Sequence, residues 1–384
     1  MRYESARLAG FSVSEDKNDR GDLDISFLCL TFILLGMGLL MILSASFARA
    51  YYDPGGITGG KPAYFFNRQL TFAVLGTFIM LSASKIPMDS YRRFAYPFLI
   101  ISLLLLALVP VLGTAANGSR RWLSLPGLRF QPSELAKLAV IAALSKMISG
   151  REGRMGSFKE GILPFAAMLA LIVGLLMLEP HFSASVIIIA LGGIMLFLGG
   201  VKLRWFTGAV LVLGGALAVL LIFFPYASER IATWLDPFKS SSDEGYQIVQ
   251  SLCSIGSGGL SGLGFGRSVQ KYLYLPEEHN DFIFAVWCEE LGFIGAALLL
   301  SLFALLIIMG YYISAHCRDS FSLLMCAGLT SLIFIQVFLN VAVATNLLPC
   351  TGISLPFFSY GGTALMTDLF EMGIILSASR ELTD

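Results

Sequence analysis

The chain has 384 residues; 56% of them are hydrophobic, only 14% are charged, and 26 basic residues balance 26 acidic ones. Soluble domains carry about 25% charged residues, so this composition excludes a soluble globular enzyme. The lack of a basic excess excludes a nucleic-acid binder, and the apolar content excludes a disordered chain. We therefore expect an all-α polytopic membrane protein.

Ten apolar runs are candidate membrane-spanning helices, each of which needs about 20 residues. They are expected at 25–47, 66–84, 94–112, 132–148, 162–178, 182–199, 205–224, 281–310, 321–345 and 361–379. The first run is too long for a signal peptide and should remain as an anchor. The eighth exceeds the thickness of a bilayer, which predicts a tilt or a projection from the membrane. The domain organisation is then a tail at 1–24, a membrane domain at 25–379 and a tail at 380–384.

The distribution of Lys and Arg predicts cytoplasmic termini, because positive charge is enriched in cytoplasmic loops. Arg120, Arg121 and Arg129 break this rule, since they lie in the expected outer loop 113–131. These charges either act on a substrate or pair with lipid phosphates.

The segment 225–280, between the seventh and eighth runs, is too long for a simple connector. Residues 228–235 could form a short interfacial helix, and the Gly-rich stretch 257–266 either approaches a ligand closely or serves as a linker. Cys253 and Cys350 are expected outside the membrane, where a disulfide between them is one alternative. The short last outer segment, 346–359, carries no charge.

Charged residues inside the expected spans are candidates for function, because burying a charge in a bilayer costs several kcal/mol. Glu134 and Lys137 are three residues apart and share a helix face. Their alternative roles are helix capping for Glu134 and a structural ion pair for Lys137. The other such residues are Asp281, Glu289, Glu290, Asp368 and Glu371.

Asp281 starts an apolar run at the expected outer boundary of the membrane. Burial there could raise the pKa of its carboxyl toward that of a general base. An N-cap on the eighth span is an equal alternative. His181 and His279 have no metal-ligand spacing, so we expect them to be packed side chains.

These residues predict a polar site at membrane depth that faces outward. Arg120, Arg121 and Lys137 supply positive charge. Asp281 and the neighbouring Glu277 and Glu278 supply carboxylates, one of which could act as a base or hold Mg²⁺. Such a site suits an amphiphilic, phosphate-bearing substrate in the outer leaflet.

Five motifs, in order, resemble the SEDS family (shape, elongation, division and sporulation proteins), which includes FtsW, RodA and SpoVE. The resemblance covers nearly the whole chain, and the wording of 270–284 is most similar to the FtsW branch. The motifs are Asn-Gly-Ser-Arg-Arg-Trp at 117–122, Gln-Pro-Ser-Glu-Leu-Ala-Lys at 131–137, Tyr-Leu-Pro-Glu-Glu-His-Asn-Asp-Phe-Ile-Phe at 274–284, Glu-Glu-Leu-Gly at 289–292 and Thr-Gly-Ile-Ser-Leu-Pro-Phe-Phe-Ser-Tyr-Gly-Gly at 351–362.

The resemblance implies a peptidoglycan glycosyltransferase that polymerises lipid II into β-1,4 glycan strands at the outer face of a bacterial cytoplasmic membrane. It implies work in cell division with a class B penicillin-binding protein, which is a transpeptidase, and with other divisome membrane proteins. A divalent cation, Mg²⁺ or Mn²⁺, is expected; a nucleotide is not, because the sugar arrives activated.

By motif, the resemblance implies that Asp281 is the essential acid, a general base with a potential metal role. Arg121 and Lys137 are expected on the pyrophosphate that leaves. The other expected substrate-binding residues are Arg120, Glu277, Glu134, Ser359 and Gly361.

The chain departs from the family pattern at 179–184, where His181 stands in place of a common acid. A metal or proton role of that acid is therefore in doubt here, or has passed to Glu179. Two alternative functions remain open: a lipid II flippase, for which ten spans with buried charges are also suitable, and a scaffold without chemistry.

Overall fold

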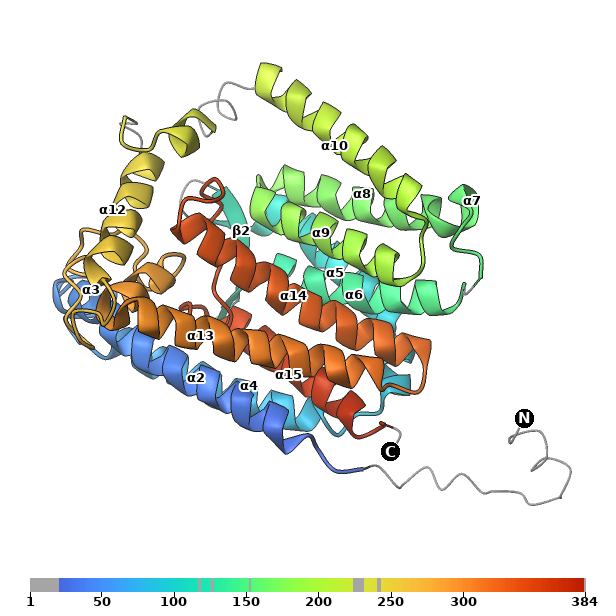
Figure 1. Cartoon of the computed structure of the whole chain (residues 1–384), viewed down its shortest axis with the longest axis horizontal. Coiled ribbons are helices and arrows are strands. Elements are labelled where there is room, and N and C mark those ends of the chain that lie inside the picture. The colour runs from blue at the N-terminus through green and yellow to red at the C-terminus, as the bar shows by residue number, and fades with distance from the viewer. Residues whose placement is uncertain are drawn as a thin grey trace, which may run out of the picture.

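The computed structural model describes residues 21–116, 119–125, 128–151, 153–223, 231–239 and 243–382. Most of these residues belong to long helices that run side by side in a bundle (Figure 1). The helices are α2 (Ile25–Ala45), α3 (Phe47–Tyr51), α4 (Tyr64–Ala83), α5 (Met88–Leu112), α6 (Pro132–Ser149), α7 (Phe158–Gly161), α8 (Leu163–Leu178), α9 (Phe182–Leu198), α10 (Leu203–Phe223), α12 (Asp243–Gly258), α13 (Ile283–Ala315), α14 (Ser320–Ala344) and α15 (Gly362–Ser379).

Each of the ten predicted runs contains a helix, which confirms the mainly helical fold. Five helical segments of the described chain are long and apolar enough to cross a membrane: 25–45, 88–112, 158–178, 283–315 and 320–344. For α4, α6, α9, α10 and α15, crossing remains a prediction.

Helices α6 and α14 form the centre of the bundle. Most of the residues of both helices are buried. α6 packs against α5, α9 and α14, while α15 packs against α4. The charged residues at the start of α6 are therefore held inside the protein, away from lipid.

The structure contains a small antiparallel sheet, which the expectation of an all-α chain did not include. Strands β1 (Thr114–Ala116), β2 (Ser119–Leu125) and β3 (Leu128–Phe130) pair in the order β1-β2-β3 within the predicted loop 113–131. In β2 Leu123 is buried while the adjacent Ser124 is exposed, which is typical of a half-buried strand. The sheet gives the three loop arginines a fixed frame.

Helix α13 is broken at Gly292, where φ is 65° and ψ is −165°. At 33 residues it would be about 50 Å long if unbroken, against about 30 Å of hydrocarbon. A neighbouring segment fills the break with four backbone hydrogen bonds: Leu263 N to Glu289 O (3.0 Å), Gly264 N to Glu290 O (2.9 Å), Phe293 N to Gly259 O (2.9 Å) and Ile294 N to Leu260 O (3.1 Å). The long eighth run thus starts with a separate helical piece, which begins beside Asp281.

The predicted outer loop 225–280 is partly helical. It contains the 16-residue helix α12, which packs on α13, and a helical turn at 231–235. The rest of the interfacial helix expected at 228–235 lies outside the described residues. No disulfide joins Cys253 and Cys350 in the described structure, so that alternative is not realised there.

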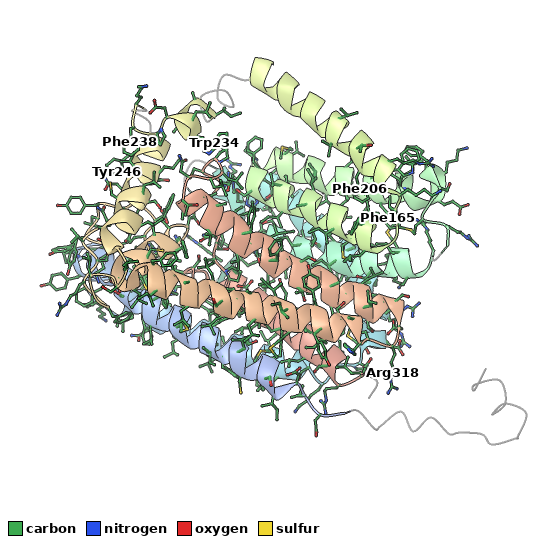
Figure 2. All side chains as sticks on the ribbon, viewed as in Figure 1. Phe165, Phe206, Trp234, Phe238, Tyr246 and Arg318 are labelled. Atoms are coloured by element: carbon green, nitrogen blue, oxygen red, sulfur yellow. The ribbon has the colours of Figure 1, made fainter. Side chains whose placement is uncertain are left out.

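The first and last described segments meet at one end of the bundle, where Gly21 N donates to Arg380 O at 3.0 Å. Arg318 lies at this end and donates from Nη2 to Leu382 O, whereas Trp234 and Phe238 lie at the opposite end (Figure 2). The residues around Asp281 also lie at that opposite end, because α13 starts there (Figure 1).

Candidate active site

A polar cavity of about 220 Å³ lies at the end of the bundle opposite the meeting point of Gly21 and Arg380. Its walls come from the sheet, the starts of α6 and α9, helix α14, the segment before α13 and the segment before α15. The lining residues central to the chemistry are Arg121, Trp122, Gln131, Glu134, Lys137, His181, Glu277, Asp281, Gln336, Gly352, Ser359 and Gly361.

Asp281 is partly buried in this cavity, and its carboxylate accepts no hydrogen bond from any residue that the structure describes. Burial, together with the nearby Glu277, raises its pKa to about 7, although Arg121 acts in the opposite direction. The alternative that Asp281 caps the helix is wrong, because Phe282 occupies the N-cap position of α13 and no side chain caps it. The carboxylate is therefore available for chemistry.

The main chain around Asp281 is held on several sides. Asn340 Nδ2 donates to Asp281 O at 2.8 Å, and Ser359 Oγ donates to Asn280 O at 2.8 Å. Asn280 Nδ2 in turn donates to Glu277 Oε2 at 2.5 Å, which orients the second carboxylate.

The buried Glu278 anchors the same segment from behind through a two-point contact with Arg49, at 2.8 and 3.1 Å. Burial acts to raise the pKa of Glu278, but hydrogen bonds with His279 and Arg49 outweigh it and lower the pKa. His279 packs against Phe65 and Tyr360, with ring centroids 4.8 and 5.7 Å away. The expectation that His279 is a packed side chain is confirmed.

Arg121 extends from β2 into the cavity, and its Nη2 donates to Pro180 O at 2.6 Å. Its charge acts on Asp281 and also on Glu179. Arg120 is exposed and does not line the cavity, so the structure does not bring it together with the other predicted residues.

Lys137 is buried and forms an ion pair with Glu134, with Nζ and Oε2 2.7 Å apart. Both residues line the cavity, so the structural ion pair and the functional location coexist. Asp368 and Glu371 on α15 are also buried and lie within electrostatic range of Lys137. Lys137 lines the cavity, and its positive charge also offsets the negative charge of several nearby acids.

His181 also lines the cavity, with its Nε2 3.3 Å from Gln131 Nε2. Burial, with Arg121 and Lys137 nearby, lowers its pKa to about 3, so the ring is neutral. Glu179 lies beneath the surface, and burial raises its pKa to about 8 while Arg121 opposes the rise. Glu179 is therefore protonated more readily than the exposed, ionised carboxylates that commonly bind metal ions.

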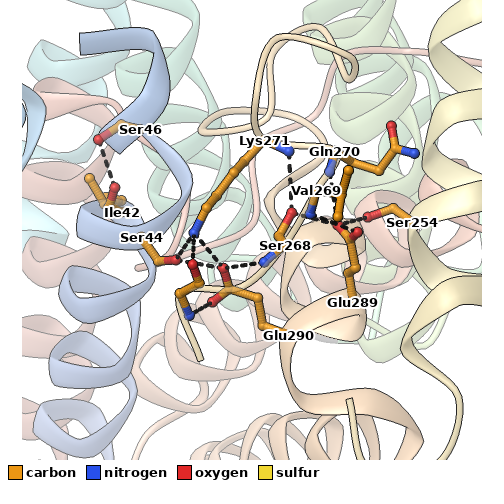
Figure 3. Close-up of polar contacts among 11 residues, drawn as sticks. Ile42, Ser44, Ser46, Ser254, Ser268, Val269, Gln270, Lys271, Glu289 and Glu290 are labelled. Carbon is orange, nitrogen blue, oxygen red and sulfur yellow. Dashed lines mark hydrogen bonds and ion pairs between the residues drawn. The ribbon is translucent and has the colours of Figure 1, made fainter. Parts of the chain in front are cut away.

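Glu289 and Glu290 do not line the cavity. They form a buried polar cluster, which we call the clamp (Figure 3). Glu290 binds Lys271 Nζ (3.0 Å), Ser44 Oγ (2.6 Å) and Gly266 N (2.9 Å). Glu289 accepts from Val269 N (3.0 Å), Ser254 Oγ (3.1 Å) and Ser268 Oγ. The clamp fastens the segment 266–271 to α2, α12 and α13.

Two polar amides support the cavity from within the bundle, and sequence reasoning assigned neither of them to the site. Gln69 on α4 is fully buried; its Nε2 donates to Ser359 O at 3.2 Å, and its Oε1 accepts from Gly361 N at 3.3 Å. Gln336 on α14 lines the cavity. A polar amide inside an apolar run was the available signal for both.

The cavity can accommodate the expected divalent cation, although the described residues contain no group of three or more His, Cys, Asp and Glu side chains poised to hold a metal. Asp281 and Glu277 both line the cavity, and their charges influence one another. Mg²⁺ commonly uses one or two carboxylates together with waters and substrate phosphates. These two carboxylates therefore fit a cation that also binds the substrate.

The family model FtsW/RodA/SpoVE, described as "Cell cycle protein", matches residues 25–384. The chain belongs to this family, the SEDS family. It is 36% identical to stage V sporulation protein E of Bacillus subtilis over 93% of this chain and 97% of that protein. It is 38% identical to the probable peptidoglycan glycosyltransferase FtsW of Coxiella burnetii over 91% of this chain and 94% of that protein.

Solved structures agree with the SEDS assignment. A chain of a peptidoglycan synthase complex superposes with a TM-score of 0.77 at 29% identity, covering 93% of this chain and 98% of that one. The rod shape determining protein RodA of Thermus thermophilus superposes with a TM-score of 0.69 at 28% identity, covering 94% and 98%. The chain is thus a multi-pass membrane protein with the SEDS fold.

Proposed function

We propose that this SEDS protein is a peptidoglycan glycosyltransferase that polymerises lipid II into β-1,4 glycan strands during cell division. The observation that carries the proposal is the juxtaposition, in one cavity, of a carboxylate whose pKa is near 7 with Arg121 and the buried Lys137. Relatives named probable peptidoglycan glycosyltransferase FtsW support the same activity.

Asp281 accepts the proton of the 4-hydroxyl of the incoming GlcNAc. A general base is most effective when its pKa lies near the working pH, and a value of about 7 meets that requirement. The oxygen attacks the anomeric carbon of the lipid-linked donor, the glycosidic bond to the pyrophosphate breaks, and the configuration inverts in a single displacement. Glu277, which accepts a hydrogen bond from Asn280, contributes to the raised pKa of Asp281 through its negative charge.

Arg121 and Lys137 bind the polyprenyl pyrophosphate as negative charge develops on it. Fixed cations in a poorly solvated site stabilise such charge more than water does. Ser359 and Gly361 line the same cavity and complete the substrate-binding surface, and Glu134 orients Lys137. A divalent cation held by Asp281 and Glu277 would add charge stabilisation when bound. The substrate needs no nucleotide.

The partner is a class B penicillin-binding protein within the divisome. An apolar groove of about 390 Å³ runs between α13 and α14, and Phe303, Ile307, Val337 and Val341 are among its lining residues. A groove of this kind suits a single apolar helix of the transpeptidase. The peptidoglycan synthase complex among the solved relatives supports this pairing.

The protein lies in the bacterial cytoplasmic membrane with both termini cytoplasmic and the cavity facing outward. The described chain ends meet at one end of the bundle and the cavity lies at the other, which is the arrangement this orientation requires. The glycan product is then made on the side where the cell wall lies.

The break in α13 gives little support to the alternative function, a lipid II flippase. Transporters often use the open ends of broken helices to bind substrates and ions. Here the backbone of 259–264 occupies the break with four hydrogen bonds, so these groups are already satisfied.

The deciding experiment is lipid II polymerisation by the purified complex with its transpeptidase in detergent, where membrane sidedness does not exist. We expect long glycan strands from the natural protein. Asp281→Asn should reduce kcat by about 10³-fold, because general-base catalysis contributes about 10²–10⁴-fold. A variant that still polymerises at the natural rate would refute the role of Asp281. Absence of polymer from the natural complex would refute the activity.

A further inference from the structure

The amide of Asn340 joins the main chain of the catalytic segment to the centre of the bundle. Asn340 lies on α14 and is 1% exposed. Its Nδ2 donates to Asp281 O at 2.8 Å and to Ile353 O at 2.7 Å. One side chain thus satisfies two carbonyls from segments that are 72 residues apart in sequence.

The two carbonyls belong to two chain segments that pack closely against each other. Gly352 precedes Ile353 and has φ of 58°, and a Cβ built on it would lie 3.1 Å from Asp281 Oδ2. The carboxylate of Asp281 therefore packs directly on the 350–354 segment. A change in the spacing between these two segments would move the carboxylate relative to the rest of the cavity.

Helix α14 is a firm support for this bridge. Ser251 Oγ on α12 donates to Ala344 O at 2.7 Å, close to the outer end of α14. Just beyond that end, Trp234 Nε1 donates to Asn346 O at 3.1 Å, and Asn346 Nδ2 donates back to Trp234 O at 3.2 Å. Gln336, one helical turn from Asn340, lines the cavity, so this face of α14 is directed toward the site.

We propose that Asn340 is a positioning residue of the glycosyl transfer reaction, which fixes Asp281 against the 350–354 segment at the distance that proton abstraction needs. This inference rests on the proposed function of the cavity. Asn340 does not line the cavity, and it acts on the reaction through the main chain of Asp281.

A positioning residue of this kind affects the chemical step more than substrate binding. The lining cations Arg121 and Lys137 are supported by other contacts, namely Pro180 and Glu134. Loss of the Asn340 amide leaves these contacts in place but frees the carbonyl of Asp281. A displacement of about 1 Å in a catalytic group can cost about 10²-fold in rate.

The test is steady-state polymerisation of lipid II by the purified complex with its transpeptidase, with Asn340→Ala and Asn340→Asp. We expect kcat to fall by about 10–100-fold, while KM stays within about threefold because binding to the lining residues is retained. Asn340→Asp keeps the shape of the side chain, but an ionised carboxylate cannot donate to either carbonyl. It should therefore be at least as impaired as Asn340→Ala.

Ser331→Ala is the matched control. Ser331 is also a fully buried polar residue on α14, and its Oγ lies 2.8 Å from Tyr311 Oη, so its loss removes a helix–helix contact remote from Asp281. Thermal unfolding and complex formation are measured for all variants, so that kcat refers to folded complexes.

A Ser331→Ala complex with natural kcat beside impaired Asn340 variants supports the inference. Equal kcat in Asn340→Ala and Ser331→Ala, or a loss confined to KM, overturns it. A natural complex that makes no polymer refutes the proposed function instead, and the two failures are therefore distinguishable.

Discussion

The clamp and the cavity both contain acidic groups inside an apolar bundle, but the two sites differ in how those groups are hydrogen-bonded. In the clamp, Glu290 contacts a lysine, a hydroxyl and a backbone amide, all within 3.0 Å. In the cavity, Asp281 faces Arg121 only at longer range, and among the described residues it accepts no hydrogen bond.

The difference separates acids that hold the structure from acids that do chemistry. A fully hydrogen-bonded buried carboxylate has no lone pair to spare for a substrate. An acid left without such partners keeps its pKa shifted and its oxygens free, which costs stability but favours reaction. The two arginines of β2 differ in location, because Arg121 lines the cavity whereas Arg120 is exposed and does not.

Among the tests of this comparison, disrupting the clamp is expected to have the largest effect, which is on the free energy of unfolding. Lys271→Met leaves Glu290 as an uncompensated buried charge, and losing one partner of a buried ion pair costs about 3–5 kcal/mol of unfolding free energy. The double variant Lys271→Met with Glu290→Gln removes both charges and should recover a large part of that loss. Unfolding by denaturant in detergent measures both values. A single variant as stable as the natural protein would show that the clamp is not structural.

The two arginines of β2 provide a smaller and more selective effect. Arg121→Ala should lower the polymerisation rate by about 10²-fold, because it removes a cation from the developing pyrophosphate charge. Arg120→Ala should stay within about twofold, because an exposed side chain away from the cavity contributes little. Both are measured as kcat on the purified complex. Equal losses in the two variants would place Arg120 in the site after all.

The smallest expected effect is a shift in pH dependence. Burial and Glu277 raise the pKa of Asp281 to about 7, and Arg121 opposes this rise. Since the ionised carboxylate is the base, the rate should increase about tenfold per pH unit below the pKa and level off above it. Glu277→Gln removes a like charge and should move the midpoint of kcat/KM to lower pH. A midpoint that moves upward would contradict this electrostatic arrangement.

The helices and much of the cavity could be predicted from the sequence. Apolar runs locate the bundle helices, and the motifs around Arg121, Lys137, Asp281 and Ser359 come together as expected. Glu289 and Glu290 could not be told apart from Asp281 by sequence, because all three are acids in apolar surroundings. Their roles depend on partners from other parts of the chain. Lys271 and Ser44 contact Glu290, and Ser254 and Val269 contact Glu289.

Tertiary contacts explain the other differences from the sequence predictions. The cap role of Asp281 was a fair alternative, but α13 starts two residues later than the predicted run. Asn340 is a polar residue on a lipid-length helix, and only the fold shows that it turns inward to Asp281 and Ile353. The small sheet was missed because its strands are three to seven residues long.

The crossing at the break in α13 also has a consequence for sequence variation. A Cβ on Gly292 would lie 2.3 Å from Gly262 N, and one on Gly262 would lie 2.2 Å from Glu290 O. In a library of random variants, both glycines should therefore be depleted of substitutions as strongly as reactive residues are. Neither glycine lines the cavity. Intolerance to substitution at these two positions therefore reflects the close packing of two main-chain segments and carries no information about the reaction.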